Sequence, residues 1–141
     1  MFKSKIIAFI LCLSLFIPCT TAFANPSPTP DPSNPIHINY ILNQVEDSLE
    51  DTLDKQYKVD WDFDIYYENG VVKLIIEYDA QDAKAFNKIS KEQLTELITT
   101  ISKQINDALG QEVPVEGIIK EDDKTTPTYT FMYKDGKVDI K

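Results

Sequence analysis

Residues 59–78 read VDWDFDIYYENGVVKLIIEY, a pattern that specifies a β-hairpin. Large apolar side chains alternate with polar ones on both sides of the central dipeptide Asn69-Gly70. Alternation with a period of two is typical of a half-buried strand, and Asn-Gly is the strongest short hairpin signal. The sequence therefore predicts two antiparallel strands joined by a two-residue turn.

A two-residue turn also fixes which residues of the two strands face each other. Pairing across it sets apolar residues opposite one another in four places: Tyr67 and Val72, Ile65 and Leu74, Phe63 and Ile76, Trp61 and Tyr78. Cross-strand apolar pairs stabilise a sheet, and the agreement supports both the turn and the register. The other face carries carboxylates, with Asp62 opposite Glu77, Asp60 opposite Asp79 and Asp64 opposite Ile75.

Two amphipathic helices flank the predicted hairpin. Before it, Asn34 is a good N-cap with Pro35 at the first helical position, and apolar residues recur at helical spacing as far as Leu53. After it, Ser90 and Gln93 form a capping box for a second helix. That helix ends at Gly110, and one further helical turn is expected near residues 83–87.

Three later segments have strand character. They span Val113–Lys120, Thr128–Tyr133 and Lys137–Ile140, the last short and joined to its neighbour by the turn Asp135-Gly136. Pro114 marks the first of them as an edge strand or lies at its start. The order α-β-β-α-β-β, with a short last β, predicts an α+β two-layer sandwich with two helices on one face of an antiparallel sheet. This order resembles a circularly permuted ferredoxin-like arrangement, although periodicity leaves the strand order open.

The N-terminus has the features of an export signal. Lys3 and Lys5 precede an uncharged apolar run over residues 6–17, and Ala22-x-Ala24 has the small residues of a signal peptidase site. The run is well short of the ~20 residues that span a bilayer. We therefore expect cleavage after Ala24, with an uncleaved anchor as the alternative, and a protein of the bacterial envelope or the extracellular medium.

The chain accordingly divides into three parts. Residues 1–24 are the expected cleaved secretory signal peptide, residues 25–36 a proline-rich linker, and residues 37–141 a single α+β domain. Both cysteines, Cys12 and Cys19, lie in the signal, so the exported chain would have no disulfide. No membrane span is expected after cleavage.

The charge of the chain limits its partners. All 14 basic residues are lysine, and 23 acidic residues give a net charge of −9, or −11 once Lys3 and Lys5 leave with the signal. Such a field repels phosphate backbones, and the chain lacks the arginine fork that reads phosphate and guanine. Nucleic-acid binding is therefore not expected, whereas a cation or a basic protein surface would be attracted.

The carboxylates of the hairpin are the candidate metal site. An EF-hand loop beginning at Asp60 fails, because Ile65 and Val71 occupy the positions of its glycine and last glutamate. A cation shared across the strand face remains, and calcium suits such oxygen ligands. The candidate ligands are Asp60, Asp62, Asp64, Glu77 and Asp79. The alternatives are a solvated patch and a surface for a basic partner protein.

Catalytic signals are few, and we predict that the protein is not an enzyme. A flat, exposed acidic face offers neither a cleft nor a carboxyl with a raised pKa. His37 is the only histidine, and no glycine-rich phosphate loop is present. The sequence thus favours a small exported domain that acts by binding. An inhibitor or regulator of an exported enzyme, using the acidic hairpin or residues 121–126, and a carboxylate-dependent hydrolase are the alternatives.

Overall fold

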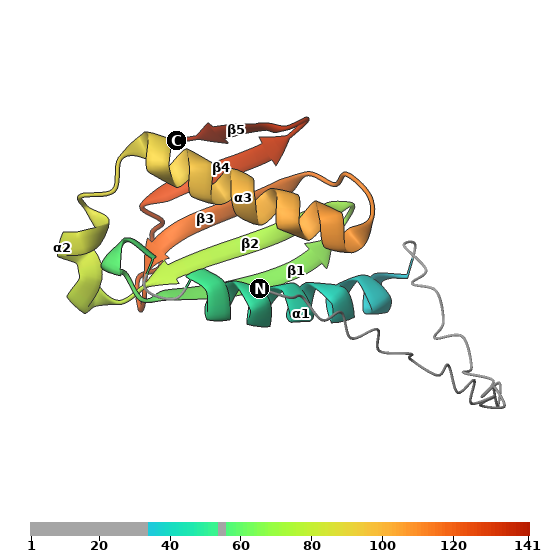
Figure 1. Ribbon diagram of the computed structural model, residues 1–141, viewed down its shortest axis with the longest axis horizontal. Helices are drawn as coiled ribbons and strands as arrows, with labels where there is room; N and C mark the ends of the chain where they lie inside the picture. Colours follow the sequence, from blue (N-terminus) through green and yellow to red (C-terminus); the bar gives the residue numbers. More distant parts are fainter. Residues whose placement is uncertain (1–33, 54–55) are drawn as a thin grey trace, which may run out of the picture.

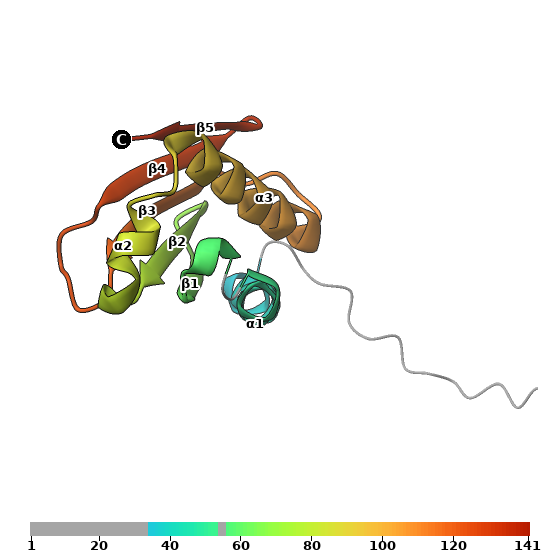
Figure 2. The same cartoon turned by 60° about the vertical axis from the view of Figure 1, so that its left-hand side comes forward.

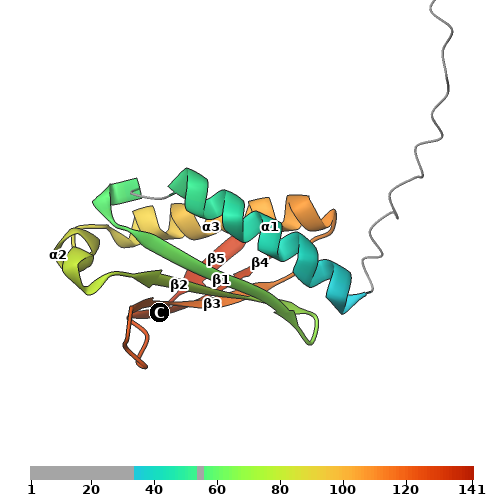
Figure 3. The ribbon, with the colours of Figure 1, turned by 90° about the horizontal axis from the view of Figure 1, so that it is seen from below.

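Five strands form one sheet in the computed structural model, which describes residues 34–53 and 56–141. The predicted signal peptide and nearly all of the predicted linker lie outside these residues. The strands are β1 (Trp61–Glu68), β2 (Val71–Tyr78), β3 (Val115–Glu121), β4 (Tyr129–Lys134) and β5 (Lys137–Ile140), and they lie side by side in chain order (Figure 1). Two long helices, α1 (Pro35–Leu53) and α3 (Lys91–Leu109), cover one face, and the short helix α2 (Ala83–Phe86) lies at one end (Figure 3). The predicted α+β two-layer sandwich is confirmed.

One neighbouring pair of strands is parallel. β2 and β3 run in the same direction with α2 and α3 in the connection between them, while the other three pairs are antiparallel. Direct adjacency of β2 and β3 differs from the split βαβ unit of a ferredoxin-like arrangement. β3 is also a central strand, so Pro114 lies just before the start of a strand and does not mark an edge. The carbonyl of Pro114 accepts the N–H of Val72 at 2.9 Å.

The β1–β2 hairpin has the predicted register. All four apolar pairs are present, as are Asp62 opposite Glu77 and Asp64 opposite Ile75. Asn69 and Gly70 both have positive φ, 50° and 86°, as a type I′ turn requires. The predicted pairing of Asp60 with Asp79 is not part of this ladder, which ends at Trp61 and Tyr78. Before β1 the chain is not extended, since residues 56–58 form a 3-10 turn in which Tyr57 and Lys58 have φ of 60°.

Both long helices begin where their capping residues predict. The Asn34 side chain accepts the N–H of Ile36 at 3.1 Å. At α3, Ser90 Oγ accepts the N–H of Gln93 at 3.2 Å, and Gln93 Oε1 accepts the N–H of Ser90 at 2.9 Å. Each reciprocal bond satisfies a donor that the first turn of a helix would otherwise leave without a partner.

The core lies between the helices and the sheet (Figure 2). α1 contributes a buried stripe at helical spacing: Ile38, Leu42, Val45, Leu49 and Leu53. Gly117 of β3 also faces this layer, where the ring of Phe131 and the carbonyl of Leu74 occupy the space that a Cβ would need. A side chain at position 117 would therefore displace the ring.

Candidate acidic cleft

A cleft of about 510 Å³ opens at the end of the sheet where β1 begins and β2 ends. Carboxylates from four parts of the chain surround it: the end of α1, the start of β1, the end of β2 and the residue after β3. The nine lining residues are Glu50, Asp51, Asp60, Trp61, Asp62, Glu77, Tyr78, Asp79 and Asp122. Seven of the nine are acidic, so the cleft concentrates the negative charge of the chain in a concave site.

An aromatic cluster supports this cleft from beneath. The rings of Tyr78 and Phe86 are stacked, with centroids 4.0 Å apart, and Trp61 meets Phe86 edge-on at 6.1 Å. Trp61 Nε1–H donates to the carbonyl of Gln56 at 2.9 Å, so its indole is held in one orientation. Trp61 and Tyr78 line the cleft and are nevertheless almost fully buried. The floor is therefore fixed by packing, and the exposed carboxylates form the rim.

The parallel pairing of β2 with β3 changes the charge of the hairpin. It sets Lys120 opposite Glu77, and the two side chains form an ion pair. The hydrogen bond that the Lys120 ammonium donates to Glu77 raises the pKa of Lys120, so the lysine stays charged. One of the predicted like-charge contacts, Asp62 with Glu77, is thus partly neutralised by a strand more than 40 residues further along the chain.

The five predicted metal ligands are only partly brought together. Asp60, Asp62, Glu77 and Asp79 line the cleft, whereas Asp64 does not. Asp79 also accepts a hydrogen bond from Gln81 Nε2 at 2.8 Å. Within residues 34–53 and 56–141, no group of three or more His, Cys, Asp or Glu side chains is arranged to hold a metal ion. The calcium site therefore stays a prediction.

The acidic surface is hollowed rather than flat as the sequence suggested. The difference arises because α1 runs along β1 and places Glu50 and Asp51 beside the strand face, while the Asp122 N–H donates to the carbonyl of Tyr78 at 2.9 Å. Strand periodicity gave no sign of these three residues, because Glu50 and Asp51 lie on the helix before the hairpin and Asp122 follows β3. Glu50 and Asp51 are adjacent acids near the end of the predicted first helix, and this was the signal in the sequence that could have pointed to two of them.

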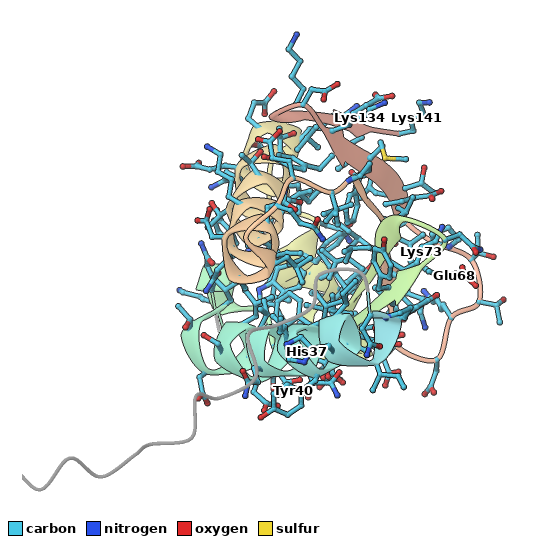
Figure 4. The ribbon with its side chains drawn as sticks, turned by 90° about the vertical axis from the view of Figure 1, so that its right-hand side faces the viewer. His37, Tyr40, Glu68, Lys73, Lys134 and Lys141 are labelled. Carbon is cyan, nitrogen blue, oxygen red and sulfur yellow. The ribbon has the colours of Figure 1, made fainter. Side chains whose placement is uncertain are left out.

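Two titratable side chains lie apart from this cleft. Desolvation raises the pKa of Glu46 on α1, whose carboxylate accepts the backbone N–H of Ile65 at 2.9 Å. His37 is half-buried beside Tyr40, with ring centroids 6.3 Å apart, rather than on the open surface (Figure 4). Neither residue lines the cleft.

The sheet face opposite the helices carries mixed charge. Lys73 of β2 and Glu116 of β3 form an ion pair at 2.7 Å beside a hollow of about 380 Å³. Figure 4 shows Glu68 and Lys73 on one side of this face, and Lys134 and Lys141 toward β4 and β5. Tyr66, 40% exposed, is the one large exposed aromatic residue of this face among those described. Lysines and acids are therefore mixed on this face, whereas seven of the nine residues that line the cleft are acidic.

No protein-family model, curated protein or solved structure gives a significant match to this chain. In the part of the chain that the structure describes, no helix combines the length and the apolar character needed to cross a membrane.

Proposed function

We propose that this protein is a small exported, non-catalytic domain that binds a basic segment of a partner protein in its acidic cleft. The observation that carries the proposal is the lining itself, in which seven of the nine described residues around a concave site are acidic. Concave sites lined by one sign of charge focus the field and raise the local concentration of the opposite charge. A lysine- or arginine-bearing segment is the ligand that such a site attracts.

The rigid floor supports binding rather than catalysis. Trp61 and Tyr78 are almost fully buried and held by Phe86, so the backbone that carries the neighbouring carboxylates is fixed in position. Glu46, whose pKa is raised, lies outside the cleft lining and is engaged with the Ile65 N–H. A general acid would need such a pKa next to the bound ligand.

Intrinsic fluorescence tests the proposal directly. Trp61 is the only tryptophan of the chain and lies in the cleft, so its emission reports occupancy. Titrating residues 25–141 with a decalysine peptide should give a saturable change that weakens steeply as the salt rises from about 50 to 500 mM. A decaglutamate peptide should give none.

Matched variants separate the cleft from the general charge of the protein. Asp62→Asn with Asp79→Asn removes two charges from the lining and should weaken decalysine binding roughly tenfold, since each surface ion pair contributes about 0.2–1 kcal/mol. Glu96→Gln with Asp107→Asn removes two exposed charges from α3, outside the cleft, and should change the affinity little. Equal weakening by both pairs would reject the cleft as the binding site.

Calcium is the competing ligand for the same carboxylates. A rise in the melting temperature with calcium but not magnesium, abolished by Asp62→Asn with Glu77→Gln, would establish a cation site. An equal rise in the melting temperature with both ions would show only that cations screen the acidic surface.

Export is tested separately by expressing the full chain in a bacterium. The proposal expects the protein outside the cytoplasm with Asn25 as its first residue. Retention of Met1 in the cell membrane would support an uncleaved anchor instead.

A further inference from the structure

The sheet ends at β5, which has a neighbouring strand, β4, on one side only (Figure 1). Thr130 and Lys141 exchange both backbone hydrogen bonds, at 3.0 and 2.9 Å. In an antiparallel pair such doubly bonded residues alternate with residues whose N–H and C=O point outward. Val138 and Ile140 are the outward residues of β5. Among the described residues, no hydrogen bond to these outward groups is formed.

This edge also lacks the excess of negative charge that the chain has as a whole. Residues 134–141 carry three lysines and two aspartates, against a net charge of −9 for the whole sequence. Lys137 and Asp139 of β5 both lie on the sheet face away from the helices and are exposed. A strand that docks here therefore meets both signs of charge in alternation.

We infer that β5 pairs with β5 of a second copy, antiparallel and across a two-fold axis at Val138. This register sets Lys137 opposite the partner's Asp139, twice by symmetry, and lets the outward groups of Val138 bond to those of its equivalent. A register centred on Asp139 instead sets aspartate against aspartate and lysine against lysine, which is unfavourable for residues directly opposite each other. Charge complementarity therefore selects the first register.

Space for the second strand exists beside β5. A hollow of about 410 Å³ lies between the first turns of α3 and this strand, lined by Lys91, Glu92, Thr95, Val138, Asp139 and Ile140. Side chains of the docking strand on the helix face of the sheet would enter it. The dimer would have a continuous ten-stranded sheet, and its two acidic clefts would lie at opposite ends, since each cleft is formed at the β1–β2 side.

Sedimentation velocity of residues 25–141, which include every described residue, tests this inference. A single strand pair is a small interface, so concentrations from about 5 to 500 µM are needed. The expected result is a reversible shift from monomer to dimer over that range. A monomer at every concentration would overturn the inference.

Charge-swap variants test the register. Lys137→Asp should weaken the dimer about tenfold, as should Asp139→Lys, because each creates two like-charge pairs. The double variant Lys137→Asp with Asp139→Lys should recover the wild-type dissociation constant to within roughly threefold. Circular dichroism of each variant confirms that this exposed strand remains folded. Unchanged association in both single variants, or tighter association of Lys137→Asp, would overturn the proposed pairing.

Discussion

The two edge strands of the sheet, β1 and β5, have similar local structure, but a helix covers the outer edge of β1 only. Each belongs to a hairpin with a two-residue turn of positive φ, Asn69-Gly70 at one edge and Asp135-Gly136 at the other. Each therefore directs every second N–H and C=O outward. At β1 the side chains of α1 meet these groups: Glu46 accepts the Ile65 N–H at 2.9 Å, and Asn39 accepts the Tyr67 N–H at 2.8 Å.

The difference arises from where the helices lie. α1 precedes β1 in the chain and runs along it, whereas α3 crosses the sheet and packs against α1, β4 and β5 from the face (Figures 1 and 2). A long strand with exposed backbone groups is a template for association, and a covering helix removes that template. The eight-residue edge strand is covered, and the four-residue edge strand is not.

Weakening the packing of α1 on the sheet should have the largest effect on the difference between the two edges. Leu49→Ala removes a fully buried side chain of α1 and should lower the free energy of unfolding by about 2–5 kcal/mol. It should also make the protein associate through β1, which loses its cover. Urea denaturation measures the first effect, and light scattering with thioflavin T measures the second.

Tyr40→Ala is the control for that variant, because Tyr40 lies on the same helix and is 60% exposed. It should leave both measurements near the wild-type values. Destabilisation by Leu49→Ala without any association would mean that the β1 edge is protected by something other than α1.

Removing only the two side-chain acceptors should have a smaller effect. Asn39→Ala with Glu46→Ala leaves α1 in place but deletes both hydrogen bonds to β1, a loss of about 1–3 kcal/mol for two such bonds. The amide protons of Ile65 and Tyr67 should then exchange with solvent much faster than in the wild-type protein. Hydrogen exchange followed by NMR measures these rates residue by residue.

Asn43→Ala with Asp47→Ala is the matched pair for that experiment, since both residues are exposed on the same helix. Exchange at Ile65 and Tyr67 should not change in this variant. Equal acceleration in both double variants would attribute the protection to helix stability rather than to the two acceptors.

The pH dependence of Glu46 gives the smallest expected effect. Desolvation raises its pKa above the ordinary value of 4.5, so the folded protein binds this proton more tightly than the unfolded chain does. Stability therefore falls as the pH rises from about 4.5 through the raised pKa. Glu46→Gln keeps an acceptor for the Ile65 N–H and removes the ionisation.

The stability of Glu46→Gln relative to wild type should thus increase between about pH 4 and pH 7, as measured by urea denaturation across that range. Glu96→Gln, an exposed substitution on α3, controls for the loss of one negative charge. A relative stability of Glu46→Gln that falls with rising pH would show that the ionised carboxylate stabilises the β1 edge.

Much of the fold follows from the sequence because the relevant signals are local. The register of the β1–β2 hairpin depends on a two-residue turn and on the alternation of apolar and polar side chains over twenty residues. The start of α3 depends on Ser90 and Gln93, which are three residues apart. The predicted Asp135-Gly136 turn likewise sets Tyr133 opposite Val138. Steric and hydrogen-bonding preferences of neighbouring residues are enough to specify such features.

These local signals predict only part of the candidate site. Four of the five predicted carboxylates do line the cleft, because the hairpin register sets Asp62 opposite Glu77 and the other two, Asp60 and Asp79, lie just beyond the same end of the ladder. Whether they lie on a flat or a concave surface depends on Glu50, Asp51 and Asp122, which come from elements on either side of the hairpin. Periodicity identifies the face on which a residue lies but not the neighbour that a strand or helix will find.

The sequence alone therefore determined the element order, the helix caps, both hairpins and the excess of negative charge. Tertiary structure decided that β3 lies beside β2, that Lys120 neutralises Glu77, and that α1 covers one edge of the sheet while β5 is left open. The physical reason is the separation along the chain of the residues that interact. Turns and caps are settled between residues a few positions apart, whereas strand neighbours are chosen by the burial of whole apolar faces across the chain.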